Sequence, residues 1–331
     1  MKEIYVGAIC ARPGEKTKGF LKIGETPYGT DIELPIMIIN GVEPGKKLWI
    51  QSAIHPVEWT GTMALIKIFN YLDPAKMRGA LIAVPVVNIT GFGLLGRGSV
   101  YDPIDMNRVW PGKVEGSFTE QMVTILFEHI TKVADYLIDF HCAGHPKTKW
   151  VLHYKGDTEA AIESRKFADA FGWEIVVESE CPRLAGAVYT QAMKKGIPSI
   201  IVEAGQGMSF SGSGVTKEAV DWSYEGILNA LKYLKIIDGI PKKPEWYVHC
   251  DDFCWSEADP LPQVRTMRGG IVWALKEPGE RVSKDEVIAE VYNVWGELVE
   301  KVKSPVNGII LTINSRPATN GFPVAQIGII P

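Results

Sequence analysis

Two residue types that bind metals stand three positions apart at the end of an apolar run. His55 and Glu58 follow "KLWIQSAI" in the stretch "QSAIHPVEWTGTMAL". The end of a strand places one side chain at the edge of a sheet, and the following turn returns the residue three positions later to the same side. Catalytic zinc sites often use two histidines, one glutamate and a water. The pair therefore predicts a metal site that needs a third protein donor.

The best candidate for the third donor is a histidine that ends a second apolar run. His141 closes "YLIDFH" and is followed by small residues, which leave room for a ligand. It lies far from Glu58 in the sequence, so only a sheet could bring the two together. His145 is the rival, but it lies beyond the turn expected at Gly144. Without a strand-terminal His141, a structural role for the His-x-x-Glu pair would be the better interpretation.

A long loop carries the candidate anion-binding residues. The stretch "NITGFGLLGRGSVYDPIDMNRVWPG" follows a strand-like run, and loops of this length in compact domains are usually functional. It contains Arg97, Asn107 and Arg108, and guanidinium groups bind carboxylates through two parallel hydrogen bonds. We expect these three residues to bind a substrate carboxylate. The alternative is that the arginines lie on the surface and pair with Asp102 and Asp105.

Three carboxylates have further candidate roles. Asp105 is expected to accept the second ring N–H of His55, since histidines that bind metals usually donate this proton to a carboxylate. Asp139, on the strand of His141, is expected to satisfy a loop amide. Glu203, in "PSIIVEAGQG", ends another apolar run. A carboxylate there could take a proton from water and deliver it to a leaving amine. A helix cap or an ion pair with a core arginine is the alternative for Glu203.

The elements that must position these residues alternate between strand and helix. Residues 1–45 read as short antiparallel strands, and apolar runs of strand length then alternate with helical periodicity. The runs are "LWIQSAI", "ALIAVPVVN", "YLIDFH", "WVLHY" and "SIIVEAG", and the helices are expected at about 57–72, 117–136, 158–171, 184–195 and 215–236. Continuous apolar runs indicate strands covered on both faces. We therefore predict an α/β fold with a mixed, mostly parallel sheet flanked by helices.

A change of composition divides the chain. Proline, glycine and lysine cluster in "IDGIPKKPE", and short strands with turns follow. We predict an α/β domain at 1–240 and a small all-β domain at 246–331. "EPGERVSKDEVIAEV" and "KSPVNGIIL" resemble a biotinyl/lipoyl-type barrel-sandwich, in which the modified lysine would fall near Glu297. The resemblance therefore implies an unmodified module, which we interpret as a lid.

The composition excludes several classes of function. The net charge of −4 offers no broad basic field, so we expect no nucleic-acid partner. The first ten residues lack the pattern of a signal peptide, and the apolar runs are too short to span a membrane. The five cysteines are scattered and odd in number, which favours a reducing, cytoplasmic location.

Taken in order, the motifs resemble the succinylglutamate desuccinylase/aspartoacylase family of the zinc carboxypeptidase superfamily. The segments are "PGKKLWIQSAIHPVEWTG", "DMNRVWPG", "DFHCAG" and "VEAG", followed by the β unit. The resemblance implies a zinc carboxypeptidase-like fold and one zinc ion per chain. It implies that His55, Glu58 and His141 hold the zinc ion. Asn107 and Arg108, together with Arg97, would bind the substrate carboxylate. Glu203 would be the general base and acid.

The resemblance also implies an activity, though not a particular substrate. We expect hydrolysis of the amide bond of a small N-acylated amino acid, because a lid over the cleft would exclude long chains. A zinc carboxypeptidase acting on peptides and a non-catalytic zinc-binding protein are the alternatives. Many members have His-Gly-Asp/Asn-Glu where this chain has Pro56 and Val57 between the ligands, so the substrate is not transferred. Relatives suggest a homo-oligomer.

Overall fold

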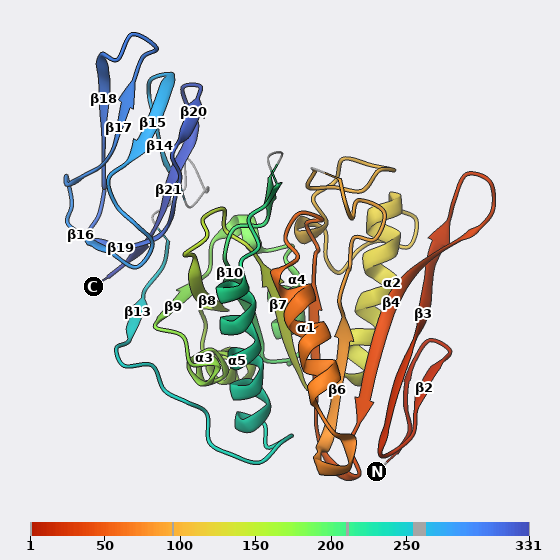
Figure 1. Ribbon diagram of the computed structural model, residues 1–331. Coiled ribbons are helices and arrows are strands. Elements are labelled where there is room, and N and C mark those ends of the chain that lie inside the picture. Colours follow the sequence, from red (N-terminus) through yellow and green to blue (C-terminus); the bar gives the residue numbers. More distant parts are fainter. Residues whose placement is uncertain (1, 95, 210–211, 254–262, 331) are drawn as a thin grey trace.

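Nine strands form the central sheet of the protein (Figure 1). The computed structural model describes residues 2–94, 96–209, 212–253 and 263–330, and the strand count refers to these. The strand order is β13-β9-β8-β10-β7-β5-β6-β4-β3. The bounds are β3 Glu15–Glu25, β4 Asp31–Asn40, β5 Glu43–Ser52, β6 Arg78–Val84, β7 Tyr136–His141, β8 Lys149–Tyr154, β9 Ile175–Ser179, β10 Ser199–Ala204 and β13 Val248–Cys250.

The sheet is mixed and mostly parallel, as predicted. The parallel pairs are β13–β9, β9–β8, β10–β7, β7–β5 and β5–β6. The antiparallel pairs are β8–β10, β6–β4 and β4–β3. The amino-terminal residues form antiparallel strands, including a hairpin of β1 (Ile4–Val6) and β2 (Ile9–Ala11). Two short antiparallel strands, β11 (Met208–Ser209) and β12 (Gly212–Ser213), follow β10.

Five α-helices of the described ranges flank the sheet, each inside a predicted range. They are α1 Thr60–Tyr71, α2 Phe118–Val133, α3 Glu159–Phe171, α4 Val188–Lys194 and α5 Lys217–Tyr233. Short 3₁₀ helices occur at η1 Pro74–Lys76, η2 Met106–Arg108 and η3 Pro182–Leu184. Ser117 and Glu120 form a capping box that fixes the start of α2. None of the described helices combines the length and the apolar character that crossing a membrane requires.

The alternation of side chains along the strands builds a core on each side of the sheet. In β5, Leu48 and Ile50 pack with α1, α3 and α5, whereas Trp49 points to the opposite face and packs with α2 and α4. All three side chains are fully buried. Burying a side chain of this size stabilises the fold by roughly 1.5–3 kcal/mol. This two-sided burial explains why the strand sequences read as continuous apolar runs.

The carboxyl-terminal part of the chain forms two four-stranded antiparallel sheets, which confirms the predicted small all-β unit. One contains β14 Val264–Arg265, β21 Pro323–Ile329, β19 Gly308–Ile313 and β16 Arg281–Val282, and the other contains β18 Leu298–Lys303, β17 Val287–Tyr292, β15 Gly270–Ala274 and β20 Arg316–Ala318. Ile309 and Leu311 pack against Trp150 and Ile201 of the central sheet. The two sheets therefore lie beside the β8–β9–β13 end of the central sheet (Figure 1).

Two details concern the sequence predictions for this part. β13 follows the linker but pairs with β9 of the central sheet; the division into domains at 240 and 246 stays a prediction. Glu297 lies in the turn between β17 and β18, where its backbone N–H donates to Asn293 Oδ1. The turn in which the modified lysine of a biotinyl/lipoyl-type module was expected thus contains an acidic residue, Glu297.

Candidate metal centre and active-site cleft

Neighbouring parallel strands bring the candidate residues to one edge of the sheet. His141 is the last residue of β7, and Glu203 lies directly opposite it in the register of β10 and β7. His55 follows the end of β5, on the other side of β7. Between β5 and His55, Ala53 has a φ of 56°, a left-handed conformation that turns the chain out of the strand. The carboxyl edge of such a sheet is where α/β proteins bind ligands.

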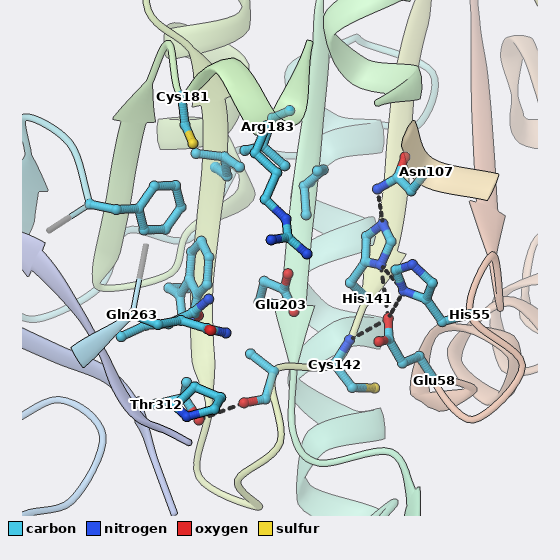
Figure 2. Close-up of a pocket in the computed structure, with 18 of the residues that line it drawn as sticks. His55, Glu58, Asn107, His141, Cys142, Cys181, Arg183, Glu203, Gln263 and Thr312 are labelled. Carbon is cyan, nitrogen blue, oxygen red and sulfur yellow. Dashed lines mark hydrogen bonds and ion pairs between the residues drawn. The ribbon is translucent and has the colours of Figure 1, made fainter. Parts of the chain in front are cut away.

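His55, Glu58 and His141 converge in a buried cluster, the triad (Figure 2). Glu58 Oε2 lies 2.9 Å from His55 Nδ1 and 2.8 Å from His141 Nδ1. The two Nδ1 atoms are 3.2 Å apart. The candidate ligand atoms all lie within 4.8 Å of one another, so a single ion could contact all three.

Each histidine of the triad is held by a carboxylate on its other ring nitrogen. His55 Nε2 lies 3.0 Å from Asp105 Oδ1, and His141 Nε2 lies 2.9 Å from Asp139 Oδ2. The expectation that Asp139 satisfies a loop amide is therefore wrong: it contacts His141, and its other oxygen accepts from the side chain of Gln51 on β5. Side chains two apart on a strand share a face, which brings Asp139 within reach of His141.

The electrostatics of the triad favour a cation. If both Nε2 atoms donated their protons to the carboxylates and both rings were neutral, the two Nδ1 atoms would present lone pairs to each other and to Glu58. Burial lowers the pKa of His141, but Asp139 and Glu58 outweigh it and hold that pKa well above its usual value. Burial raises the pKa of Glu58, yet the imidazoles of His55 and His141 bring it well below its usual range. Two histidines and one glutamate are also a donor set that catalytic zinc sites use.

Arg97 lies beside the triad. Its Nε donates to Asp105 Oδ2 at 3.0 Å, and its Nη1 is 3.7 Å from Glu58 Oε1. About half of its side chain is exposed. Asp105 therefore bridges His55 and Arg97, one through each carboxylate oxygen. The alternative predicted an ion pair between a surface arginine and Asp105. Arg97 does pair with Asp105, but this ion pair lies beside the triad and not on a remote surface.

Asn107 and Arg108 lie on η2, above the triad. Asn107 Oδ1 accepts from the backbone N–H of Val188, which turns its Nδ2 to within 3.1 Å of His141 Nε2. Arg108 Nη1 donates to the carbonyl of Asn107, while its buried Nε has no hydrogen-bond partner among the described residues. Burial lowers the pKa of Arg108, and the neighbouring Arg97 and Arg183 lower it further. A partly buried cation with an unpaired N–H is suited to bind an anion.

Glu203 has an environment that suits proton transfer. Burial raises its pKa to about 7; Glu58 also raises this pKa, while His141 and Arg97 lower it. Its Oε2 is buried and has no hydrogen-bond partner among the described residues. A carboxyl group with a pKa near neutrality can both accept and return a proton under physiological conditions.

A cavity of about 400 Å³ contains the triad, Glu203 and the arginines. Its walls come from the central sheet, from the loop before η2, from η3 and from the carboxyl-terminal sheets. Thr312 on β19 donates a hydrogen bond of 2.5 Å to the carbonyl of Ala143, just after His141 (Figure 2). The carboxyl-terminal unit therefore forms one wall of the cleft and is bonded to the loop after the triad.

Sequence reasoning missed several residues of this cleft. Arg183 on η3 extends toward Glu203 (Figure 2), and Asn314 and Gln326 from the carboxyl-terminal sheets line the same cavity. Strand β9, which leads to η3, was also missed. The arginine in "ECPRLAG" could have been predicted to line the cleft, but only if the preceding "EIVVES" had been recognised as a strand. No spacing in the sequence marks Asn314 or Gln326, because a separate sheet brings them to the site.

The rival histidine lies outside the cluster. His145 Nδ1 accepts from the backbone N–H of Lys147, two residues later, and is partly exposed in the loop between β7 and β8. Among the described residues, the group of side chains that could hold a metal consists of His55, Glu58 and His141. His141 is therefore the better placed of the two histidines.

Comparison with known proteins places this arrangement in a family. Residues 44–234 match the model of the succinylglutamate desuccinylase/aspartoacylase catalytic domain. The chain belongs to this family. The matched range contains the triad, Arg97, Asn107, Arg108 and Glu203, so the predicted family is confirmed.

A curated relative and two solved structures are similar over most of their length. The chain is 24% identical to an N-alpha-acetyl-L-2,4-diaminobutyric acid deacetylase of Halomonas elongata, over 83% of this chain and 80% of the relative. A succinylglutamate desuccinylase/aspartoacylase from Rhodobacter sphaeroides superposes with a TM-score of 0.81 at 24% identity, covering 97% of each chain. The product-bound ectoine utilization protein EutE (DoeB) from Ruegeria pomeroyi gives 0.80 at 20% identity, covering 96% of each. The two structures share the fold of this chain, including its carboxyl-terminal part.

Proposed function

We propose that the protein is a zinc-dependent deacylase that hydrolyses the amide bond of a small N-acylated amino acid or a related carboxylate-bearing amide. The observation that carries the proposal is the convergence of His55, Glu58 and His141 beside Glu203, in a cavity that Arg108 also lines. The family includes deacylases, and the Halomonas relative is named for the removal of an acetyl group from an amine. Members of the family are enzymes that hydrolyse amides.

The triad residues would hold the zinc ion through His55 Nδ1, His141 Nδ1 and the Glu58 carboxylate. Asp105 and Asp139 would keep both rings in the tautomer whose Nδ1 carries a lone pair. A bound zinc ion would supply polarisation of the amide carbonyl and a lowered pKa for water. The convergence of two imidazoles and one carboxylate fits such an ion, because the carboxylates around His141 favour a positive charge at this position, which either a proton or a metal ion can supply.

Glu203 would move the proton. Its carboxylate accepts a proton from the attacking water, whose oxygen forms the new bond to the carbonyl carbon. The same carboxyl group then gives that proton to the nitrogen as the C–N bond breaks, which releases a carboxylic acid and an amine. A pKa near 7 allows both directions of transfer. Its Oε2 has no hydrogen-bond partner among the described residues, so it could accept a hydrogen bond from this water.

The arginines would orient the substrate. Arg108, beside Asn107, would bind the substrate carboxylate, which fixes the amide relative to Glu203. Arg97 lies between Asp105 and Glu58, where it would stabilise the negative charge that develops on the carbonyl oxygen. Holding the reacting groups in place in this way can lower the barrier by several kcal/mol, roughly 7–11 in well-oriented model reactions.

The experiment that tests the proposal is a panel of N-acyl amino acids and short peptides, assayed with and without a chelator. We expect turnover of N-acyl amino acids that the chelator abolishes and added zinc restores. Turnover of peptides without deacylation would instead identify a carboxypeptidase. The wall formed by the carboxyl-terminal sheets favours the small substrate, because it closes one side of the cleft. Absence of zinc and of both activities would identify a non-catalytic protein.

We also place the protein in the cytoplasm. Cys10, Cys142 and Cys250 are free thiols in the structure. Free thiols persist in reducing compartments, where glutathione and thioredoxin keep them reduced.

A further inference from the structure

The cavity of the cleft has two ends of different character. One end contains the triad, Glu203 and the guanidinium groups of Arg97, Arg108 and Arg183, the last of which extends toward Glu203 (Figure 2). The rest of the described lining is uncharged: its apolar side chains include Trp150, Leu152, Leu184, Ile201, Phe253 and Phe322, and polar, neutral residues such as Gln263 and Gln326 lie with them. Such a cavity fits a molecule that carries its charge at one end and an apolar group at the other.

The strand register fixes where the apolar end begins. Across the sheet, His141 on β7, Glu203 on β10 and Trp150 on β8 lie opposite one another in a single row. One step along the same face, Ile201 on β10 lies opposite Leu152 on β8. The apolar floor therefore starts beside Glu203, on the side of β10 that faces away from the triad.

This position determines which part of the substrate occupies the apolar end. In the proposed function, Glu203 gives its proton to the leaving nitrogen, so the nitrogen-bearing part of the substrate lies next to it. A second, more open hollow shares Glu58 and Arg97 with the cavity and continues past Val57 and Met208. The acyl group then points toward that open hollow, and the side chain of the released amino acid lies over β8.

The charges of the described lining restrict that side chain. Glu58 and Glu203 are the carboxylates among the described residues that line the cavity, and both belong to the catalytic end. A cationic side chain over Leu152 and Ile201 would be buried without an anionic partner among the residues that the structure describes. Burying an unpaired charge costs several kcal/mol, whereas burying an apolar side chain is favourable.

We propose that the amino acid released by this enzyme has a neutral, mainly apolar side chain, aliphatic or aromatic. This inference rests on the proposed deacylase function and names the substrate class of that same site. It separates the chain from the Halomonas relative, whose named substrate carries a second amine. A cavity of about 400 Å³ has room for such a side chain together with the amide and the carboxylate.

Two unpaired polar atoms border the apolar end. Trp150 Nε1 and Gln326 Oε1 are buried and have no hydrogen-bond partner among the described residues. Both residues line the cavity, and the side chain of Trp150 is buried. A donor and an acceptor without charge suit a neutral polar group, such as a phenolic hydroxyl. The class therefore includes tyrosine beside leucine and phenylalanine.

The wild-type enzyme provides the first test. We expect kcat/KM for N-acetyl-leucine, N-acetyl-phenylalanine and N-acetyl-tyrosine to exceed that for N-acetyl-2,4-diaminobutyrate and N-acetyl-aspartate by at least about tenfold, the effect of burying one apolar side chain. Faster hydrolysis of either charged substrate would overturn the inference and leave the deacylase function intact. Hydrolysis of none of the five would contradict the proposed function itself.

A charge placed at the apolar end provides the second test. The pair Leu152→Asp and Leu152→Asn differs only in charge, so their comparison removes the effect of lost packing. We expect Leu152→Asp to favour N-acetyl-2,4-diaminobutyrate over N-acetyl-leucine at least about tenfold more than Leu152→Asn does. Equal preference in the two variants would overturn the inference. Because Leu152 is buried, the pair Phe322→Asp and Phe322→Asn, at a half-buried loop position, gives the same comparison if the first pair does not fold.

Discussion

Glu203 lies directly opposite His141 in the register of the parallel strands β10 and β7. The proton-transfer candidate and a metal-ligand candidate are therefore positioned by backbone hydrogen bonds rather than by flexible loops. A shift of the register by one residue would turn either side chain to the opposite face of the sheet. The burial of Ile200 and Val202 among the helices on that opposite face fixes the register, which couples the core to the chemistry.

Replacing Glu203 tests its role in proton transfer. Glu203→Gln keeps the shape of the side chain but removes its ability to take a proton. We expect kcat to fall by about 10²–10⁴, the usual size of acid–base assistance, while zinc content is unchanged. Steady-state kinetics together with metal analysis checks this expectation. Glu178→Gln on β9 is the matched control, and turnover of Glu203→Gln close to that of the control would exclude Glu203 as the base.

The two rival histidines can be separated by metal content. His141→Ala removes a side chain whose Nδ1 lies 2.8 Å from Glu58, so we expect zinc occupancy and activity to fall together. His145→Ala changes a loop residue that contacts Lys147, and we expect both quantities to stay near those of the wild type. Metal analysis of both purified variants is the measurement. The opposite pattern would assign the ligand to His145.

Arg108 is expected to bind the substrate carboxylate through two parallel N–H groups of its guanidinium. Arg108→Lys keeps the charge but loses the second parallel hydrogen bond to a carboxylate. We expect kcat/KM to fall by about 10–100-fold, chiefly through KM, since a hydrogen bond to a charged group contributes roughly 1.5–3 kcal/mol. The surface variant Arg78→Lys, at an ion pair with Asp238, serves as the control. An unchanged KM in Arg108→Lys would show that the carboxylate binds elsewhere.

Stability in acid should depend on His153. Burial, together with the nearby Arg165 and His249, lowers the pKa of this histidine to about 4, although its hydrogen bond with the carbonyl of Tyr154 acts in the opposite direction. Well above pH 6.5 the side chain is neutral in both states and has no effect. As the pH falls from 6.5 to 4, the unfolded state takes up the proton first, so the free energy of unfolding decreases by about 3 kcal/mol in total.

Removing the titrating group should reduce this loss. His153→Gln cannot take up the proton, so its melting temperature should fall less between pH 6.5 and 4 than that of the wild type. Calorimetry of both proteins across this range, with zinc removed by a chelator, is the measurement. Parallel curves for the two proteins would contradict the assignment.

The sequence predicted the elements with strong periodicity. The five helices were predicted because Leu, Ile and Phe recur at helical spacing, and strands such as β7 because their two covered faces make them continuous apolar runs. β9 was missed because its apolar run is short, with three residues between Glu174 and Glu178. The sequence made no prediction for the direction of β8, which runs antiparallel to β10, because an apolar run such as "WVLHY" contains no signal for the direction of its neighbours.

Contacts between distant segments were harder to predict. Asp139 was assigned to a loop amide, since the sequence does not say that the rings of His55 and His141 meet with their Nδ1 atoms inward. Arg183, Asn314 and Gln326 reach the cleft through η3 and the carboxyl-terminal sheets, and nothing in the spacing of those segments records their position. The types of the residues were enough to predict the chemistry of the site. The residues that form the walls of the cleft could be identified only from the three-dimensional structure.

The most direct measurement is the rate of N-acyl amino acid hydrolysis as a function of zinc bound per chain. Protein stripped by a chelator would be reconstituted with increasing zinc, and occupancy and rate would be determined on the same samples. The account predicts a rate that rises in proportion to occupancy and reaches a plateau at about one zinc per chain, because the described residues offer one cluster of suitable ligands. A rate as high in zinc-free protein as in fully loaded protein would contradict the account.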